Sequence, residues 1–159
     1  MWGPTPVASP EGFKYYILFE DNYSRFCWIY PMKFKYEATQ IFLNFKKTAE
    51  NLTNHKIKTL QADWGGEYRP LKSILATFGV LFQHPCPHTH HQNEKIERKH
   101  RHITETALAL LAQSSLPFTH WWNACTTANF LINRLPTKVL NFSSPVQKLF
   151  NKNFNFNFL

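Results

Sequence analysis

Two segments set the architecture of this chain: Leu60-Gln61-Ala62-Asp63-Trp64-Gly65-Gly66-Glu67-Tyr68 and His91-Gln92-Asn93-Glu94-Lys95-Ile96-Glu97-Arg98-Lys99-His100-Arg101. The residues before Asp63 alternate in polarity, which predicts a strand, and Gly65-Gly66 ends that strand abruptly. A carboxylate at the end of a strand is well placed for chemistry. Glu97 lies early in a predicted helix, and residues 64–96 between the two acids leave room for a helix, a short strand and a loop.

The composition indicates one globular domain with a basic surface. The 159 residues are 43% hydrophobic and 16% aromatic, which is typical of a chain that buries one core. Eighteen Lys and Arg against ten Asp and Glu give a net charge of +8 at pH 7. We therefore expect a polyanionic partner, and the charge alone does not decide between nucleic acid and acidic lipid.

Cysteine usage and hydropathy predict a soluble intracellular protein. Cys27, Cys86 and Cys125 are odd in number and widely spaced, so they predict neither a disulfide framework nor paired zinc ligands. Residues 1–6 do not show the basic and then apolar pattern of a secretory signal. No apolar run approaches the ~18 residues that a membrane span needs. We expect no membrane partner.

Hydrophobic periodicity predicts the element order β-β-β-α-β-α-β-α-α. A first strand is predicted within the proline-rich residues 2–10, and further strands over residues 13–19, 25–32, 56–62 and 80–83. Helices are predicted over residues 36–52, 71–78 (ending at Gly79 as a C-cap), 93–113 and 117–136. Residues 151–159 alternate Asn and Phe, so we place this low-complexity tail outside a domain at residues 1–150.

The order of short motifs in this chain resembles the integrase catalytic core of Ty1/copia-type LTR retrotransposons. The last two acids of that family's Asp-Asp-Glu triad and their flanks match Asp63-x-Gly65-Gly66-Glu67-Tyr68 and Gln92-Asn93-x-x-x-Glu97-Arg98-Lys99-His100-Arg101. Further matches are Trp2-Gly3-Pro4, Asp21-Asn22-Tyr23-Ser24-Arg25, Trp28-x-Tyr30-Pro31-Met32-Lys33-x-Lys35, Trp121-x-x-Ala124 and Asn133-Arg134-Leu135-Pro136. The resemblance covers roughly residues 2–150.

The resemblance implies a fold, a reaction and partners. The fold would be α/β and ribonuclease H-like, with a five-stranded mixed sheet, an antiparallel meander followed by parallel strands, flanked by helices. The reaction would be DNA integration by metal-dependent phosphoryl transfer, that is, 3′ processing and strand transfer, with Asp63 and Glu97 as catalytic residues that bind Mg²⁺ or Mn²⁺. The partners would be element ends, target DNA and further copies of the chain, and a functional protein would be nuclear.

The first Asp of the triad is missing. In the family it opens an Asp-x-(Trp or Cys)-Gly-Pro motif, and alignment on Trp2-Gly3-Pro4 places it one residue before Met1. We therefore interpret the chain as a truncated fragment with a shortened first strand, weakened metal binding and strand transfer close to background. Glu11 and Asp21 are the nearest acids that could replace it; Glu11 more readily belongs to a turn, and Asp21 matches a family position outside the catalytic set.

A basic run at the start of the long helix supplies the candidate nucleic-acid contacts Lys95, Arg98, Lys99 and Arg101. Arg101 lies one turn after Glu97 on the same face, where it would meet phosphate, and the others would follow the DNA backbone. Plainer interpretations exist. The run can be a solvated face, Glu97 can form a surface ion pair with Arg101, and Asp63 can be a turn former.

Six of the eight histidines fall within residues 84–102, which raises a zinc alternative. The candidate ligands His84, Cys86, His88, His90 and His91 crowd one predicted loop. Structural zinc needs a second pair of ligands some distance away, so we do not expect zinc here. Two other functions stay open: a non-catalytic nucleic-acid-binding remnant or pseudogene product, and a metal-dependent nuclease in which another acid replaces the missing one.

Overall fold

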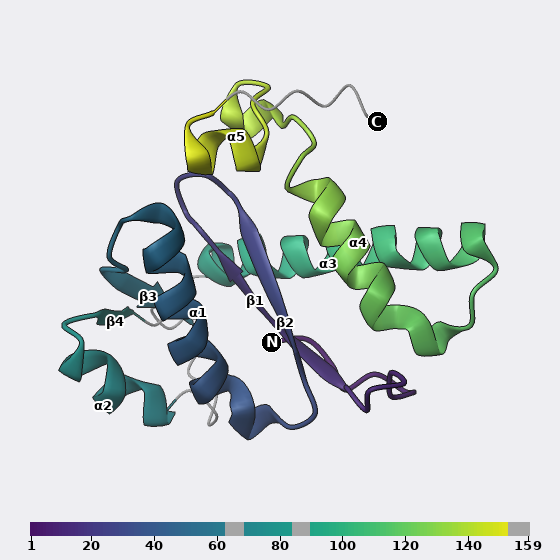
Figure 1. The fold of residues 1–159 in the computed structure, drawn as a ribbon, viewed down its shortest axis with the longest axis horizontal. Coiled ribbons are helices and arrows are strands. Elements are labelled where there is room, and N and C mark those ends of the chain that lie inside the picture. Colours follow the sequence, from purple (N-terminus) through teal and green to yellow (C-terminus); the bar gives the residue numbers. More distant parts are fainter. Residues whose placement is uncertain (63–68, 84–89, 153–159) are drawn as a thin grey trace.

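A hairpin of two antiparallel strands lies between two layers of helices (Figure 1). The computed structural model describes residues 1–62, 69–83 and 90–152. Strand β1 (Tyr15–Glu20) pairs with β2 (Cys27–Met32), and Leu18 faces Ile29 in the register. This hairpin confirms the predicted antiparallel meander over residues 13–32.

The residues of β1 alternate between two cores. Tyr16 and Leu18 pack into a cluster on one face of the hairpin, and Ile17 and Phe19 pack into another on the opposite face. Because successive side chains of a strand point to opposite faces, a strand buried on both faces is apolar along its whole length. The sequence Tyr-Tyr-Ile-Leu-Phe has this property.

Four helices lie close to their predicted positions: α1 (Ala38–Thr53), α2 (Arg69–Thr77), α3 (His90–Ser114) and α4 (Trp121–Ile132). A further helix, α5 (Pro145–Phe150), was not predicted. Single 3₁₀ turns lie at Lys35–Glu37, Phe118–His120 and Lys138–Leu140. Gly79 has φ of +66° just after α2, which confirms the predicted glycine cap. Of the described helices, none has the length and apolarity needed to cross a membrane.

The predicted five-stranded sheet is wrong in its extent. Strands β3 (Thr59–Gln61) and β4 (Leu81–Gln83) form a parallel pair, as predicted. Within residues 1–62, 69–83 and 90–152, however, this pair and the β1–β2 hairpin are two separate two-stranded sheets. The described strands therefore occur in the predicted sequence order except for the first predicted strand, and they form two sheets instead of one.

The N-terminal segment accounts for the missing strand. Trp2 exchanges two backbone hydrogen bonds with Tyr16, at 2.9 and 3.1 Å, so this segment runs antiparallel beside β1. Pro4 and Pro6 have no N–H to donate, and proline interrupts a ladder of backbone hydrogen bonds. The pairing is consequently an isolated bridge instead of a strand.

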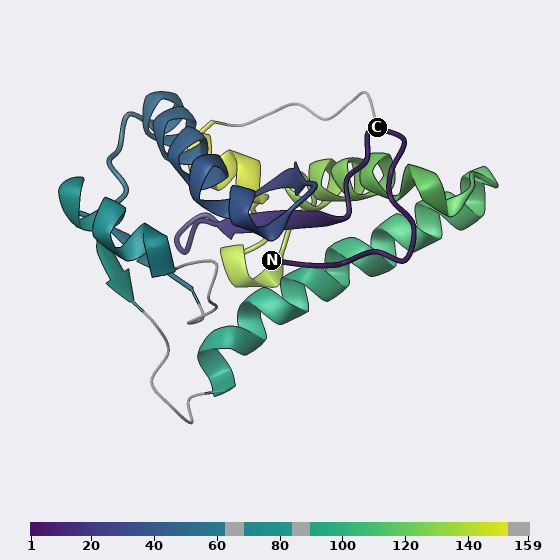
Figure 2. The same ribbon diagram turned by 90° about the horizontal axis from the view of Figure 1, so that it is seen from below.

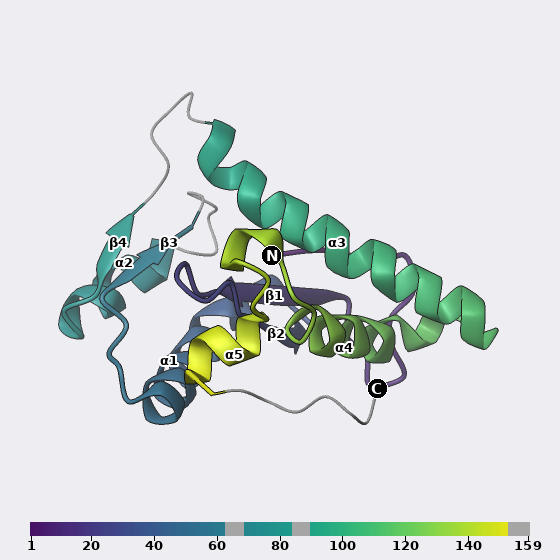
Figure 3. The ribbon, with the colours of Figure 1, turned by 90° about the horizontal axis from the view of Figure 1, so that it is seen from above.

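Helices α3 and α1 lie on opposite sides of the hairpin (Figures 2 and 3), and a hydrophobic cluster packs against each of its two faces. The first joins β1 and β2 to α3 and α4 through Ile103, Ala107, Leu111, Trp121, Ala124, Cys125, Ala128 and Ile132. The second joins them to α1, α2 and the start of β4 through Ala38, Phe42, Phe45, Ala49, Leu71, Leu75 and Val80. Each large apolar side chain contributes about 1.5–3 kcal/mol when it is fully buried.

Helix α4 is fastened to β2 by Asn133. The Oδ1 atom of Asn133 accepts a hydrogen bond from the N–H of Cys27 at 2.8 Å, and its Nδ2 donates to the C=O of the same residue at 2.8 Å. Asn129 also donates to this carbonyl, at 3.1 Å. The buried side-chain amide of Asn133 thus provides hydrogen-bond partners for both backbone groups of Cys27, at the edge of the hairpin.

Helix α5 ends at Phe150. The domain boundary at residue 150 stays a prediction. The helix begins with a capping box in which Ser144 and Gln147 bond each other's backbone N–H. Residues 153–159 of the predicted tail lie outside the described residues.

Candidate active site

A cavity of about 970 Å³ lies between the two sheets and is lined by residues of β1, β3, α1 and α3. Three acids reach it: Glu20 at the end of β1, Asp21 in the following turn, and Glu97 on α3. Lys56, Lys58 and Lys95 also line it. The cavity therefore combines carboxylates, which can bind a cation, with ammonium groups, which can bind phosphate.

Glu97 lies on the second turn of α3 with an exposed side chain. Its neighbour Ile96 packs against the hydrophobic cluster around α3 and α4. His100, which follows Glu97 by about one helical turn, is buried. The helix therefore holds Glu97 at the boundary between the core and the cavity. The alternative that Glu97 forms a surface ion pair with Arg101 is not observed between these two described residues.

Asp63 lies outside the described residues. Strand β3 ends at Gln61, and both Gln61 and Ala62 line the cavity. Ala62, the residue before Asp63, therefore lines the same cavity as Glu97. The roles of Asp63 and Glu97 as metal ligands stay predictions.

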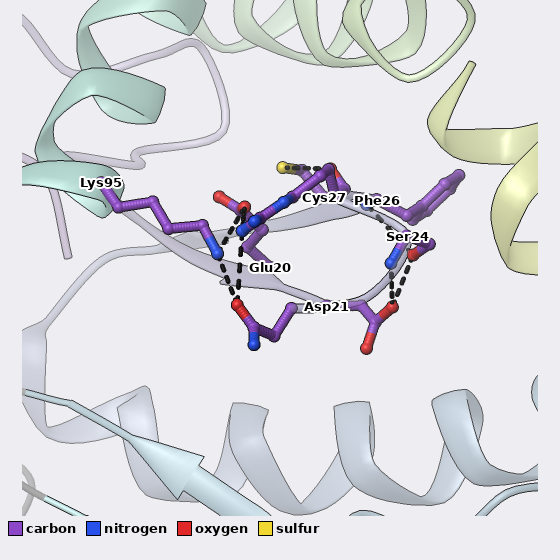
Figure 4. Close-up of polar contacts among 8 residues, drawn as sticks. Glu20, Asp21, Ser24, Phe26, Cys27 and Lys95 are labelled. Carbon is purple, nitrogen blue, oxygen red and sulfur yellow. Dashed lines mark hydrogen bonds and ion pairs between the residues drawn. The ribbon is translucent and has the colours of Figure 1, made fainter. Parts of the chain in front are cut away.

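Glu20 is a cavity residue that the sequence did not reveal (Figure 4). Its side chain is 2% exposed, and its Oε1 lies 3.3 Å from Nζ of Lys95 and 3.5 Å from Nη1 of Arg25. Burial raises the pKa of Glu20, and nearby positive charges, Lys99 first, lower it. Its Oε2 has no hydrogen-bond partner among the described residues.

Lys95 joins α3 to the turn between β1 and β2. Besides its ion pair with Glu20, its Nζ donates to Oδ1 of Asn22 at 2.7 Å. The side chain of Lys95 is 34% exposed, so this predicted DNA contact is already engaged within the protein. Its contact with DNA stays a prediction.

The two acids considered as substitutes for the missing Asp both take part in turns. Oδ2 of Asp21 accepts hydrogen bonds from the N–H and Oγ of Ser24, at 2.7 and 2.6 Å. Glu11 is exposed, precedes β1 at the opposite end of the hairpin, and accepts a hydrogen bond from Oγ of Ser9 at 2.7 Å, which lowers its pKa. These contacts agree with the expected turn role of Glu11 and give Asp21 one as well.

The remaining basic candidates differ in exposure. Arg98 and Arg101 are exposed on α3 and form no ion pair in the described part of the chain, whereas Lys99 is half-buried. The guanidinium groups of Arg98 and Arg101 are therefore free to contact an anion. A DNA contact for Arg98, Lys99 and Arg101 stays a prediction.

His100 serves the core. Its Nδ1 lies 3.0 Å from the hydroxyl oxygen of Tyr16, and burial lowers its pKa to about 3. His100 is therefore neutral at pH 7 and adds no charge to the basic run. His84, Cys86 and His88 lie outside the described residues, and the side chains of His90 and His91 are not described either. Among the side chains that the structure describes, no group of three or more could hold a metal ion.

Sequence comparisons find relatives among transposon proteins, although no protein-family model matches the chain. The chain is 41% identical over 152 residues, 96% of its length, to the retrovirus-related Pol polyprotein from transposon RE1 of Arabidopsis thaliana. It is 42% identical over 146 residues, 92% of its length, to that from transposon RE2 of the same plant. It is 35% identical over 159 residues, 99% of its length, to that from transposon TNT 1-94 of Nicotiana tabacum. The chain spans only 10%, 10% and 12% of these relatives.

Solved structures of retroviral integrases share the fold. The HTLV-2 integrase catalytic core domain in complex with magnesium, in its trimeric form, superposes with a TM-score of 0.61 at 15% identity, covering 83% of this chain and 82% of that one. The BIV integrase catalytic core domain gives 0.62 at 12% identity, covering 86% and 85%. A chain of the simian T-cell lymphotropic virus intasome in complex with PP2A regulatory subunit B56 gamma gives 0.68 at 15% identity, covering 88% and 49%. At these identities the likeness shows the fold, which is the ribonuclease H-like fold predicted.

Proposed function

The chain is homologous to one segment of the Pol polyproteins of Ty1/copia-type retrotransposons and has the fold of retroviral integrase catalytic cores, and on this premise we propose that its parent activity is DNA integration. One observation carries the proposal: Glu97 and the end of β3 line the same cavity, and Asp63 follows that strand end. This supports the proposal that the two predicted catalytic positions, which are distant in sequence, share one site.

Carboxylate oxygens suit Mg²⁺ or Mn²⁺, and in the proposed site Asp63 and Glu97 would hold these ions. When bound, divalent ions stabilise the attacking and leaving oxygens of an in-line displacement at phosphorus. The exposed Arg98 and Arg101 would hold the phosphate backbone beside them. A metal requirement also agrees with the magnesium complex of the related fold in HTLV-2 integrase.

We propose that DNA integration needs a third carboxylate beside Asp63 and Glu97. Asp21 and Glu11, the two acids that we considered for that place, accept hydrogen bonds within turns. Glu20 lines the cavity, but its Oε1 is paired with Lys95 and Arg25. We therefore propose none of these three acids as the third ligand.

A second candidate is non-catalytic nucleic-acid binding. It is favoured by the net charge of +8 and by the two exposed arginines of α3, which form no ion pair within the described residues. Binding of this kind needs no metal and would survive the loss of a carboxylate. Either function would act on DNA in the nucleus, and assembly into oligomers is supported by the dimeric and trimeric forms of the HTLV-2 domain.

The two candidates are separated by a cleavage assay on a labelled duplex in Mg²⁺ or Mn²⁺. We compare the chain as it stands, a version with Asp-Leu in place of Met1, and the Asp63→Asn and Glu97→Gln variants of that version. Cutting by the Asp-Leu version that is lost in both variants supports an integrase core whose third acid precedes Trp2. Metal-dependent cutting by the unaltered chain would contradict the need for an acid at that place. Duplex binding without cutting by any version would favour the second candidate.

A further inference from the structure

Phe34 and Tyr36 form an exposed aromatic pair just after β2, at the end of the hairpin opposite to the β1–β2 turn that lines the cavity. Their rings lie 5.3 Å apart with an angle of 8° between the planes, and the two residues are 54% and 74% exposed. Single exposed apolar residues are common on protein surfaces. A stacked pair of exposed rings differs because the two rings hold each other parallel and leave the outer face of the stack for a further ring.

The segment that carries the pair is fixed in place. It connects β2 to α1 through the 3₁₀ turn Lys35–Glu37. The backbone N–H of Lys33 donates to Oε2 of Glu37 at 3.0 Å, and the N–H of Glu37 lies 3.3 Å from the C=O of Phe34. The rings are therefore ordered before any ligand arrives, which lowers the entropic cost of binding.

Two lysines neighbour the rings in the sequence, and their Nζ atoms lie 6.0 and 5.9 Å from the ring centroids of Phe13 and Tyr15. Lys33 and Lys35 alternate with Phe34 and Tyr36 in the sequence, and both lysines are exposed. Neither lysine forms an ion pair within the described part of the chain. The one acid of this segment, Glu37, is engaged by the backbone of Lys33.

These features define the chemistry of the ligand. A flat aromatic face binds another flat aromatic group, and the lysines bind an anion on the same molecule. Bases of a duplex have their faces covered by neighbouring bases, whereas an unpaired base offers a free face to an aromatic side chain. We propose that Phe34 and Tyr36, which we call the aromatic platform, bind an unpaired base of a single-stranded nucleic acid whose phosphates contact Lys33 and Lys35.

The platform lies apart from the candidate active site. Residues 33–37 do not line the cavity, which surrounds the other end of β1. A strand held at the platform would leave the cavity free for a second part of the nucleic acid. The inference relies on the proposed function only for the choice of DNA as the test ligand.

The test compares the affinity of the full chain for a labelled single-stranded oligonucleotide and for its duplex by fluorescence anisotropy. Replacing both rings, Phe34→Leu with Tyr36→Leu, keeps apolar bulk but removes the stacking face. We expect single-strand affinity to fall roughly 10-fold, in line with one lost base stack, and duplex affinity to stay unchanged. Tyr36→Trp should keep the single-strand affinity, and the new indole fluorescence should be quenched by the single strand.

Tyr23→Leu provides the matched control. Tyr23 is also exposed, at 70%, but lies at the opposite end of the hairpin, with Nζ of Lys148 4.8 Å from its ring centroid. This substitution should leave the ratio of single-strand to duplex affinity unchanged. Lys33→Gln with Lys35→Gln should weaken single-strand binding and flatten its salt dependence.

The proposal is overturned if the double leucine variant, with an unchanged circular dichroism spectrum and melting temperature, binds the single strand as the unaltered chain does. It is also overturned if single-strand and duplex affinity fall together, if Tyr23→Leu has the same effect, or if the unaltered chain binds no single strand. None of these results depends on cleavage. The assay of DNA cutting therefore judges the proposed function separately.

Discussion

The two faces of the β1–β2 hairpin are held by different kinds of contact. On the α3–α4 face, Asn133 bonds both backbone groups of Cys27, and His100 lies in hydrogen-bonding distance of Tyr16. On the α1 face, ring packing dominates, with Phe19 stacked on Phe45 at 4.2 Å. The first face thus combines apolar burial with directional bonds.

The strands of the two sheets also differ in burial. None of the residues of β3 and β4 is buried, whereas β1 is buried along four consecutive residues. Short strands with exposed backbone bonds open at lower free energy than buried ones. The α3–α4 face carries Glu97, and the other side carries the strand that leads to Asp63. The candidate site therefore joins the more stable half of the domain to the less stable half.

The largest expected effects come from truncating one buried side chain on each side. Ile103 on α3 and Leu75 on α2 are both 0% exposed. Ile103→Ala and Leu75→Ala should each lower the free energy of unfolding by about 2–5 kcal/mol, because each leaves a cavity in a packed cluster. Hydrogen exchange should distinguish them: Leu75→Ala accelerates exchange in α2 and β4 but spares β1 and β2, whereas Ile103→Ala accelerates exchange throughout. Equal, global acceleration by both would show that the two halves unfold as one unit.

The next effect tests the polar fastening of α4. Asn133→Ala should cost about 2–3 kcal/mol, since it leaves the N–H and C=O of Cys27 without these partners in a buried position. Asn129→Ala removes a single bond to the same carbonyl and should cost about 1 kcal/mol. Urea unfolding of both variants gives the comparison. Costs of equal size would mean that packing, not bonding, holds this face.

Local features of the sequence predicted the elements well. The three- and four-residue spacing of apolar side chains identified α1 and α3, and Gly79 marked the end of α2, because periodicity and capping are properties of neighbouring residues. The five-stranded sheet was overestimated because it depends on pairing between segments, which Pro4 and Pro6 interrupt in the N-terminal segment.

The contents of the site were harder to predict. Glu97 was found by resemblance to a family motif, but Glu20 was missed because an acid after an apolar strand ordinarily marks the end of burial. Its partner Lys95 is distant in the sequence, and so is the bond between Asn133 and Cys27. Such pairs exist only in the folded chain. Asn133 belongs to a motif that matches the family, but the motif did not predict its hydrogen bonds to Cys27.

A smaller effect concerns pH and the His100–Tyr16 contact. The pKa of His100 is about 3 in the folded protein and 6.5 as a free side chain, so the unfolded chain binds the extra proton between these values. Stability should therefore fall as the pH drops from 7 to 5, by about 1–2 kcal/mol from this group. His100→Gln should remove that part of the dependence. The raised pKa of Glu20 acts in the opposite direction, so the quantity to compare is the difference between the two proteins at each pH.

The smallest effect tests the contact between α3 and the hairpin at the edge of the cavity, where Lys95 pairs with Glu20 and Asn22. Lys95→Met should cost about 1 kcal/mol at pH 7, because Glu20 is then left with Arg25 alone in a buried position. The cost should shrink as the pH falls and Glu20 takes up a proton, since its raised pKa makes the neutral form accessible. In a Glu20→Gln background the same substitution should cost little, and Arg98→Met, on an exposed residue of the same helix, should stay within about 0.5 kcal/mol of the parent. A cost for Lys95→Met that neither pH nor Glu20→Gln alters would show that its contact with Asn22, and not the ion pair, joins α3 to the hairpin.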